Sequence, residues 1–198
     1  SSRRNTEYHL KRSSDVMNEN ARMTLALLEA LKENPVPVTF FSSANVPPTM
    51  DTIAIAQADK VDGYVLGKTI CETLWFVASH QRNFPLLIVR PVGVYGPRDT
   101  FKEDANLIPA LMVQARDSKD SLKVRGDGSR ERAFLYVEDL VDTLFRLIDV
   151  DARGVQYVTS GEVVTVQKLA ELIRDLVRPG LKIESDSSGH IAQRAVPM

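Results

Sequence analysis

The chain has 198 residues, of which 43% are hydrophobic and 26% are charged, and its formal net charge is −1. This composition is typical of a globular protein with one core or two small lobes, and it excludes a fibrous or disordered chain. Acidic and basic residues are interspersed, so we expect no binding to nucleic acid. The longest apolar run, residues 85–89, is far shorter than the ~20 residues that span a bilayer, so we expect no membrane insertion.

The first ninety residues alternate between helix and strand. Apolar spacing predicts a helix over residues 14–33, which ends before the prolines of "NPVP". "VTFFSS" (38–43) is typical of a buried parallel strand. A second helix is predicted over 62–81, and "PLLIVRP" (85–91) is a second buried strand. This order of elements is the repeat of a doubly wound sheet.

After this point the pattern becomes more irregular. A turn-rich stretch precedes a predicted helix in "LIPALMVQARD", a strand and loop in "LKVRGDG", and a strand that enters a helix in "RAFLYVEDL". "VQYVTSG" is predicted as a strand, residues 165–178 as a helix, and the tail contains at most one short strand. The sequence thus predicts an α/β protein, the C-terminal portion of a doubly wound parallel sheet with a small α+β lobe.

Few residues have the spacing of a disulfide or a metal site. Cys71 is the only cysteine, and the three histidines, His9, His80 and His190, lie far apart in the sequence. We therefore predict no internal disulfide and no metal site. The polar N-terminus lacks the apolar stretch of a signal peptide. These features favour a reducing compartment, either the cytoplasm or an organelle matrix.

The second predicted helix contains a tyrosine and a lysine four positions apart, Tyr64 and Lys68. Positions i and i+4 share one helix face, and a nearby cation lowers the tyrosine pKa from ~10 toward the range of a proton shuttle. Two polar residues can also share a face by chance. Ser42 and Ser43 favour a site, because they end a parallel strand, where ligands of such sheets bind. "IVRPVGVYGP" ends the next strand at the same edge.

Several stretches resemble one known family. "FFSSANV", "YVLGK", "LLIVRPVGVYGPRD", "GDGSRERAFLYVEDLVDTL" and "VQYVTSGEVVTVQKLAELI" are similar to successive signatures of the extended short-chain dehydrogenase/reductases. The resemblance is to the NAD-dependent nucleotide-sugar epimerase/dehydratase group over about residues 16–190. It is greatest to the GDP-fucose synthase type, with UDP-glucose 4-epimerases and sugar dehydratases close behind.

The resemblance implies a role for several residues near the predicted strand ends. Tyr64 becomes the acid/base, Lys68 the cation that binds the cofactor ribose and lowers the pKa of Tyr64, and Ser43 the hydrogen-bonding hydroxyl. Ser42 is an alternative shifted by one residue. Pro91 and Val94 line the nicotinamide of NAD or NADP.

The resemblance also implies contacts with a nucleotide-sugar substrate. These are assigned to Ser43, Gly93, Arg132 and Arg194. For Arg132 the alternative is a surface ion pair. Asn20 matches a recurring asparagine of the family, with a plain polar helix position as the alternative. Gly67 stands where the family usually has serine, and Gly93 where asparagine is common.

The sequence contains no glycine-rich fingerprint of the kind that binds a dinucleotide pyrophosphate. We therefore expect residues 1–95 to form a partial dinucleotide-binding core with the Ser/Tyr/Lys site, and 96–137 to form mainly the substrate-binding lobe. Residues 138–178 then return to the core as helix, strand and helix, and 179–198 form the tail of the lobe. A homodimer, or a partner chain that supplies the missing strands, is expected.

Two alternatives to an NAD(P)-dependent epimerase, dehydratase or reductase remain open. The chain can be a non-catalytic subunit or scaffold with the same fold, because fold alone does not confer activity. It can also be a thioester reductase domain, which "GYVLGKTICE" favours and "GDGSRERAF" opposes.

Overall fold

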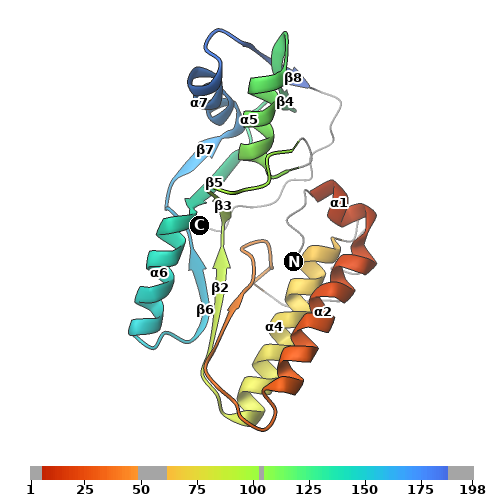
Figure 1. Ribbon diagram of the computed structural model, residues 1–198, viewed down its shortest axis with the longest axis vertical. Coiled ribbons are helices and arrows are strands. Elements are labelled where there is room, and N and C mark those ends of the chain that lie inside the picture. Colours follow the sequence, from red (N-terminus) through yellow and green to blue (C-terminus); the bar gives the residue numbers. More distant parts are fainter. Residues whose placement is uncertain (1–5, 49–61, 103–104, 187–198) are drawn as a thin grey trace. The chain divides into compact units, whose positions relative to one another are not determined.

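The computed structural model describes residues 6–48, 62–102 and 105–186. The chain divides into two compact units, one made of Ser1–Val92 and Glu138–Val158, the other of Gly93–Val137 and Thr159–Met198. Parallel strands and helices alternate along the first unit (Figure 1), so the predicted α/β class is confirmed.

The first unit contains a parallel sheet with the strand order β1-β2-β6. Its elements are α1 (Thr6–Lys11), α2 (Ser13–Ala30), β1 (Val38–Phe41), α4 (Gly63–Arg82), β2 (Leu86–Pro91), α6 (Val137–Asp149) and β6 (Gly154–Val158). The four principal elements predicted before residue 92 are therefore present within three residues of their predicted ends. In the described part of the chain, β1 pairs only with β2, so β1 is an edge strand.

The core of the first unit lies between the helix pair α2/α4 and the sheet (Figure 1). Trp75 is 2% exposed, and its indole meets the ring of Phe84 edge-on, with the centroids 6.4 Å apart. Its buried neighbours are Leu28, Ala78, Phe84, Leu86 and Ile88. Because large aromatic side chains bury the most apolar area, Trp75 is the main anchor of this core.

Two glycines allow α2 and α4 to approach closely. A β-carbon at Gly63 would overlap the backbone of Ser13, and one at Gly67 would lie 3.1 Å from the Cα of Met17. Both glycines lie one residue before a residue of the predicted site. The replacement of the family serine by Gly67 therefore has a packing reason, since a side chain there would crowd α2.

The described residues of the second unit form two small sheets and two helices. Its elements are β3 (Gly93–Tyr95), α5 (Leu107–Asp117), β4 (Ser121–Arg125), β5 (Glu131–Tyr136), β7 (Val163–Thr165), α7 (Val166–Val177) and β8 (Lys182–Asp186). The strand order is β3-β5-β7 in one sheet, and β4 pairs in parallel with β8. Helices α5 and α7 pack over β4, where Leu111 of α5 and Ile173 of α7 share a buried core with Leu122 of β4.

The segment 138–178 is shared between the two units. Residues 138–158, which contain most of α6 and all of β6, belong to the first unit, whereas α7 belongs to the second. The reason lies in packing, because Leu169, Ala170 and Ile173 of α7 are buried in the core with α5 and β4.

Candidate functional site

The first turn of α4 places Tyr64. Asp62 caps this helix, and its carboxylate oxygen Oδ1 accepts hydrogen bonds from the backbone N–H groups of Tyr64, at 3.0 Å, and of Val65, at 3.2 Å. A capping carboxylate satisfies amides that have no partner within the helix and also interacts favourably with the helix dipole. Asp62 therefore fixes where α4 begins and with it the position of Tyr64.

The ring of Tyr64 is half-buried and stacks on a histidine. The imidazole of His9, on α1, lies 4.8 Å from the Tyr64 ring between centroids, with 13° between the ring planes. His9 is 8% exposed. Sequence reasoning considered this histidine only when it excluded a metal site, and it missed the contact because nothing in the spacing links residue 9 to residue 64.

Lys68 is buried, and its ammonium lies at the carboxyl end of β1. The Nζ atom donates to the carbonyl oxygen of Phe41 at 2.7 Å, and it lies 4.9 Å from the centre of the Phe40 ring and 5.9 Å from that of Tyr64. Burial lowers the pKa of Lys68 below its ordinary value, while the charges of Cys71 and Glu72 oppose this shift. The structure thus brings Tyr64, Lys68 and the end of β1 together.

The two serines after β1 differ in their hydrogen bonding. The hydroxyl oxygen of Ser43 accepts a hydrogen bond from the backbone N–H of Asn45 at 3.2 Å, which makes a tight turn. The Ser42 hydroxyl is buried and has no hydrogen-bond partner among the residues that the structure describes. A buried hydroxyl without a partner costs free energy unless a ligand or water satisfies it. Ser42 is therefore as good a candidate for ligand contact as Ser43.

A buried ion pair lies next to this site. Arg90 of β2 donates from Nε and Nη2 to both carboxylate oxygens of Glu72, at 2.9 and 2.5 Å, and the side chains are 3% and 0% exposed. Its Nη1 donates to the hydroxyl of Tyr157 on β6 at 2.5 Å and to the carbonyl of Val46 at 3.5 Å. Burial lowers the pKa of Arg90, but the contacts with Glu72 and Tyr157 outweigh it and raise that pKa.

Sequence reasoning did not identify this pair, although a signal existed. An arginine inside the apolar run "PLLIVRP" must find a buried partner, because an unpaired buried charge is strongly unfavourable. Glu72 lies on the same helix as Lys68, four residues further on, and it provides that partner.

The remaining predicted residues lie elsewhere in the chain. Pro91 ends β2 in the first unit, whereas Gly93 and Val94 on β3, and Arg132 on β5, belong to the second unit. Arg194 lies outside the described residues. The structure therefore groups Tyr64, Lys68 and the two serines in the first unit, whereas the predicted substrate contacts Gly93 and Arg132 belong to the second unit.

Two positions that the family resemblance singled out, Gly93 and Asn20, have a local structural explanation. A β-carbon at Gly93 would lie 3.0 Å from the carbonyl oxygen of Ala133, so the close pairing of β3 with β5 favours glycine over the asparagine common in the family. Asn20, on α2 of the first unit, is 4% exposed and donates from its side chain to the carbonyl of Val16 at 2.8 Å. Asn20 therefore has a structural role that needs no ligand.

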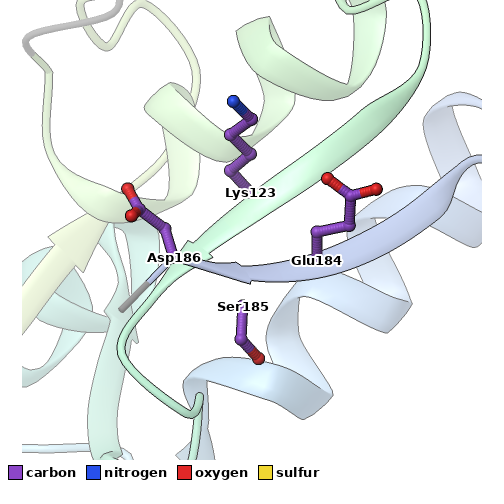
Figure 2. A pocket seen from close by; sticks show the side chains of 4 residues that line it. All are labelled: Lys123, Glu184, Ser185 and Asp186. Atoms are coloured by element: carbon purple, nitrogen blue, oxygen red, sulfur yellow. The ribbon is translucent and has the colours of Figure 1, made fainter. Parts of the chain in front are cut away.

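A polar hollow of the second unit lies over the paired strands β4 and β8. It is lined by Lys123, Glu184, Ser185 and Asp186, and Figure 2 shows Lys123 and Glu184 on one side of the strands with Ser185 on the other. Ser121 donates from its hydroxyl to Glu184 at 2.8 Å. None of the predicted site residues that the structure describes lines this hollow.

Two absences hold for the part of the chain that the structure describes. There, no group of three or more histidine, cysteine, aspartate or glutamate side chains could hold a metal ion. None of the described helices combines the length and the apolar character needed to cross a membrane.

The chain is similar to several known proteins. The model of the NAD dependent epimerase/dehydratase family matches residues 4–160. A dTDP-4-dehydro-6-deoxy-D-allose reductase of Streptomyces sp is 29% identical over 194 residues, which are 93% of this chain and 59% of the relative. A probable GDP-L-fucose synthase 1 of Oryza sativa subsp. japonica is 32% identical over 161 residues, which are 78% of this chain and 45% of the relative.

A solved structure supports the same relationship. The structure of RMD from Pseudomonas aeruginosa complexed with NADPH superposes with a TM-score of 0.73 at 25% identity, over 93% of this chain and 65% of that chain. The chain thus spans about half of the length of the curated relatives that it matches.

Proposed function

Because the chain belongs to the NAD dependent epimerase/dehydratase family, we propose that the full-length polypeptide is an NAD(P)-dependent enzyme that acts on a nucleotide-linked sugar. The reaction is an epimerisation, a dehydration or a reduction. The relatives named above act, according to their names, on dTDP-linked and GDP-linked sugars. The observation that carries the proposal is the Lys68 ammonium at the carboxyl end of β1, one helical turn from Tyr64.

The donors present at this site fit the ribose of a nicotinamide cofactor. An ammonium has three donors, and the Lys68 Nζ uses one of them on the Phe41 carbonyl, so two can reach ribose hydroxyls. The buried Ser42 hydroxyl offers one more group that needs a partner. When bound, NAD or NADP would supply hydride chemistry at the sugar.

The proposed roles of the side chains are those that the family resemblance implies. Tyr64 moves a proton to or from the sugar oxygen, and the nearby ammonium of Lys68 stabilises the phenolate form. The hydroxyl of Ser43, or that of Ser42, holds the same sugar oxygen by a hydrogen bond. Pro91 and Val94 line the nicotinamide. Gly93, Arg132 and Arg194 contact the substrate. The two arginines bind its diphosphate, for which guanidinium groups are well suited.

The test replaces the phenol of Tyr64 in the full-length protein. We expect Tyr64→Phe to lower turnover of a dTDP-, GDP- or UDP-linked sugar by about 10²-fold or more, the usual contribution of general acid–base catalysis. Circular dichroism checks that the variant is folded, and calorimetry with NADH and NADPH identifies the cofactor. Unchanged turnover in the folded variant would refute the catalytic role of Tyr64.

The open edge of β1 supports a second part of the proposal. Val38 and Ser42 donate their backbone N–H groups toward β2, so the alternate amides of Thr39 and Phe41 face away from it. Unpaired edges of this kind accept a further strand. We propose that residues outside this sequence, or a partner chain, add a parallel strand here and with it the glycine-rich phosphate loop.

Substitution at the edge tests this pairing. Thr39→Pro removes one outward amide but none that pairs with β2, so it should weaken NAD(P) binding by the full-length protein while the core remains folded. If calorimetry detects no NAD(P) binding even by the unmodified full-length protein, a non-catalytic subunit with the same fold becomes the better description.

A further inference from the structure

Glu72 lies one helical turn beyond Lys68 on α4, a spacing at which acidic and basic side chains usually pair. Here they do not pair. The Lys68 ammonium donates to the carbonyl of Phe41, and both oxygens of the Glu72 carboxylate are held by Arg90. Lys68 and Arg90 are therefore two cations that can compete for one buried carboxylate.

We propose that Arg90 is a positioning residue, which holds the carboxylate of Glu72 and thereby keeps the ammonium of Lys68 directed at the carboxyl end of β1. The importance of this positioning for catalysis rests on the proposed function, in which Lys68 binds the ribose and assists Tyr64. The positioning itself concerns only where the Lys68 ammonium lies, and it does not depend on that function.

The shape of the two cations explains why Arg90 binds the carboxylate. A guanidinium offers two parallel N–H groups that match a carboxylate, whereas an ammonium is a compact point charge. Arg90 also donates to Tyr157 on β6 and to the Val46 carbonyl after β1. Because these contacts hold its guanidinium in place, the pairing with Glu72 is fixed from the sheet side.

Among the described residues, the groups whose contacts place them around Lys68 supply no carboxylate besides Glu72. On its own helix these groups are Tyr64, Cys71 and Glu72. The sheet contributes Arg90 of β2 together with the Phe40 ring and the Phe41 carbonyl of β1. Helix α1 contributes His9, which stacks on Tyr64, and α2 contributes the uncharged side chains of Asn20 and Thr24. Burial raises the pKa of the Cys71 thiol, which favours its neutral form. Glu72 is thus the one carboxylate among the groups named here.

The experiment follows the Lys68 ammonium directly in the full-length protein. Nuclear magnetic resonance of ¹³C-labelled lysine side chains gives the pKa of Lys68, and the signal is assigned by its loss in Lys68→Met. Arg90→Met releases Glu72, so the pKa of Lys68 should rise. Glu72→Gln removes the carboxylate and leaves Arg90, so the pKa of Lys68 should fall. The double variant Arg90→Met/Glu72→Leu should bring it back toward the wild-type value.

These opposite shifts distinguish positioning from a purely structural role. Loss of packing alone would not move the pKa in opposite directions, so shifts in the same direction, or none, overturn the proposal. If Arg90→Met does not fold, Glu72→Gln and the double variant decide, and an unchanged pKa in Glu72→Gln overturns it. Arg153→Met, which breaks the exposed pair with Asp151 at 2.7 Å, is the matched control and should shift nothing.

A kinetic measurement separates this proposal from the proposed function. In an active enzyme, kcat of Arg90→Met should fall by about tenfold or more at neutral pH, because positioned proton-transfer groups contribute about 10²–10⁴-fold. The pH profile should move upward together with the pKa of Lys68. If the pKa shifts occur but the wild type turns over no sugar nucleotide, the proposed function fails and the positioning role stands.

Discussion

The contact between α2 and α4 makes an unusual prediction for Gly63. Replacing glycine by alanine in a helix normally stabilises it by up to about 1 kcal/mol. At Gly63 the new methyl group would overlap the carbonyl oxygen and the Cα of Ser13. Because these are backbone atoms, the overlap can be relieved only by moving α2 away from α4, and overpacking of this kind costs about 1–3 kcal/mol or more. We expect Gly63→Ala to lower the free energy of unfolding by about 2 kcal/mol.

The neighbouring glycine provides the matched comparison. At Gly67 the added β-carbon would lie 3.1 Å from the Cα of Met17 and 3.5 Å from the Cβ of Asn20, which a shift of a few tenths of an ångström relieves. Gly67→Ala should therefore stay within about 1 kcal/mol of the wild type. Urea denaturation of the full-length protein measures both variants. A Gly63→Ala protein as stable as the wild type would show that the helices are not in close contact.

Three further predictions concern the site. Asp62→Ala should lower the free energy of unfolding by about 1–2 kcal/mol through loss of the helix cap. Asp62→Asn keeps a hydrogen-bond acceptor and should lower it by less. If urea denaturation gives the same loss of stability for both variants, Asp62 does not act as a cap. The pKa of Lys68 is lowered from 10.5, so the unfolded chain binds more protons between the folded pKa and 10.5. The stability of the wild type relative to Lys68→Met should therefore rise with pH through that window; a falling difference contradicts this. Cys71 is fully buried and its thiol pKa is raised, so the native protein at pH 8 should react only slowly with iodoacetamide. Rapid labelling of Cys71, detected by mass spectrometry, would refute this prediction.

Long, regularly patterned elements were predictable from the sequence. The helix predicted in "LIPALMVQARD" has the bounds of α5, and the helix predicted over 62–81 differs from α4 by one residue at each end. Both carry several turns of apolar residues at helical spacing, which is a local signal. The strands β3 and β7 were missed, because three residues are too few to show alternation and each depends on pairing with the distant β5.

The Tyr64 and Lys68 positions at the end of β1 were also predictable, because spacing on a helix is local. The partners of these residues were not predictable. His9 and Arg90 reach the site only through tertiary packing, which no sequence spacing records. The choice between Ser42 and Ser43 depends on which face of the chain each occupies after the strand, and a shift of one residue exchanges those faces.

Trp75, the anchor of the core between α2, α4 and β2, is the one tryptophan among the 198 residues. Its intrinsic fluorescence therefore reports on the first unit alone, while the second unit has a separate core that contains no tryptophan. Circular dichroism, by contrast, also detects α5 and α7. Fluorescence and circular dichroism followed on the same sample can thus reveal whether the two units lose their structure together or in separate steps.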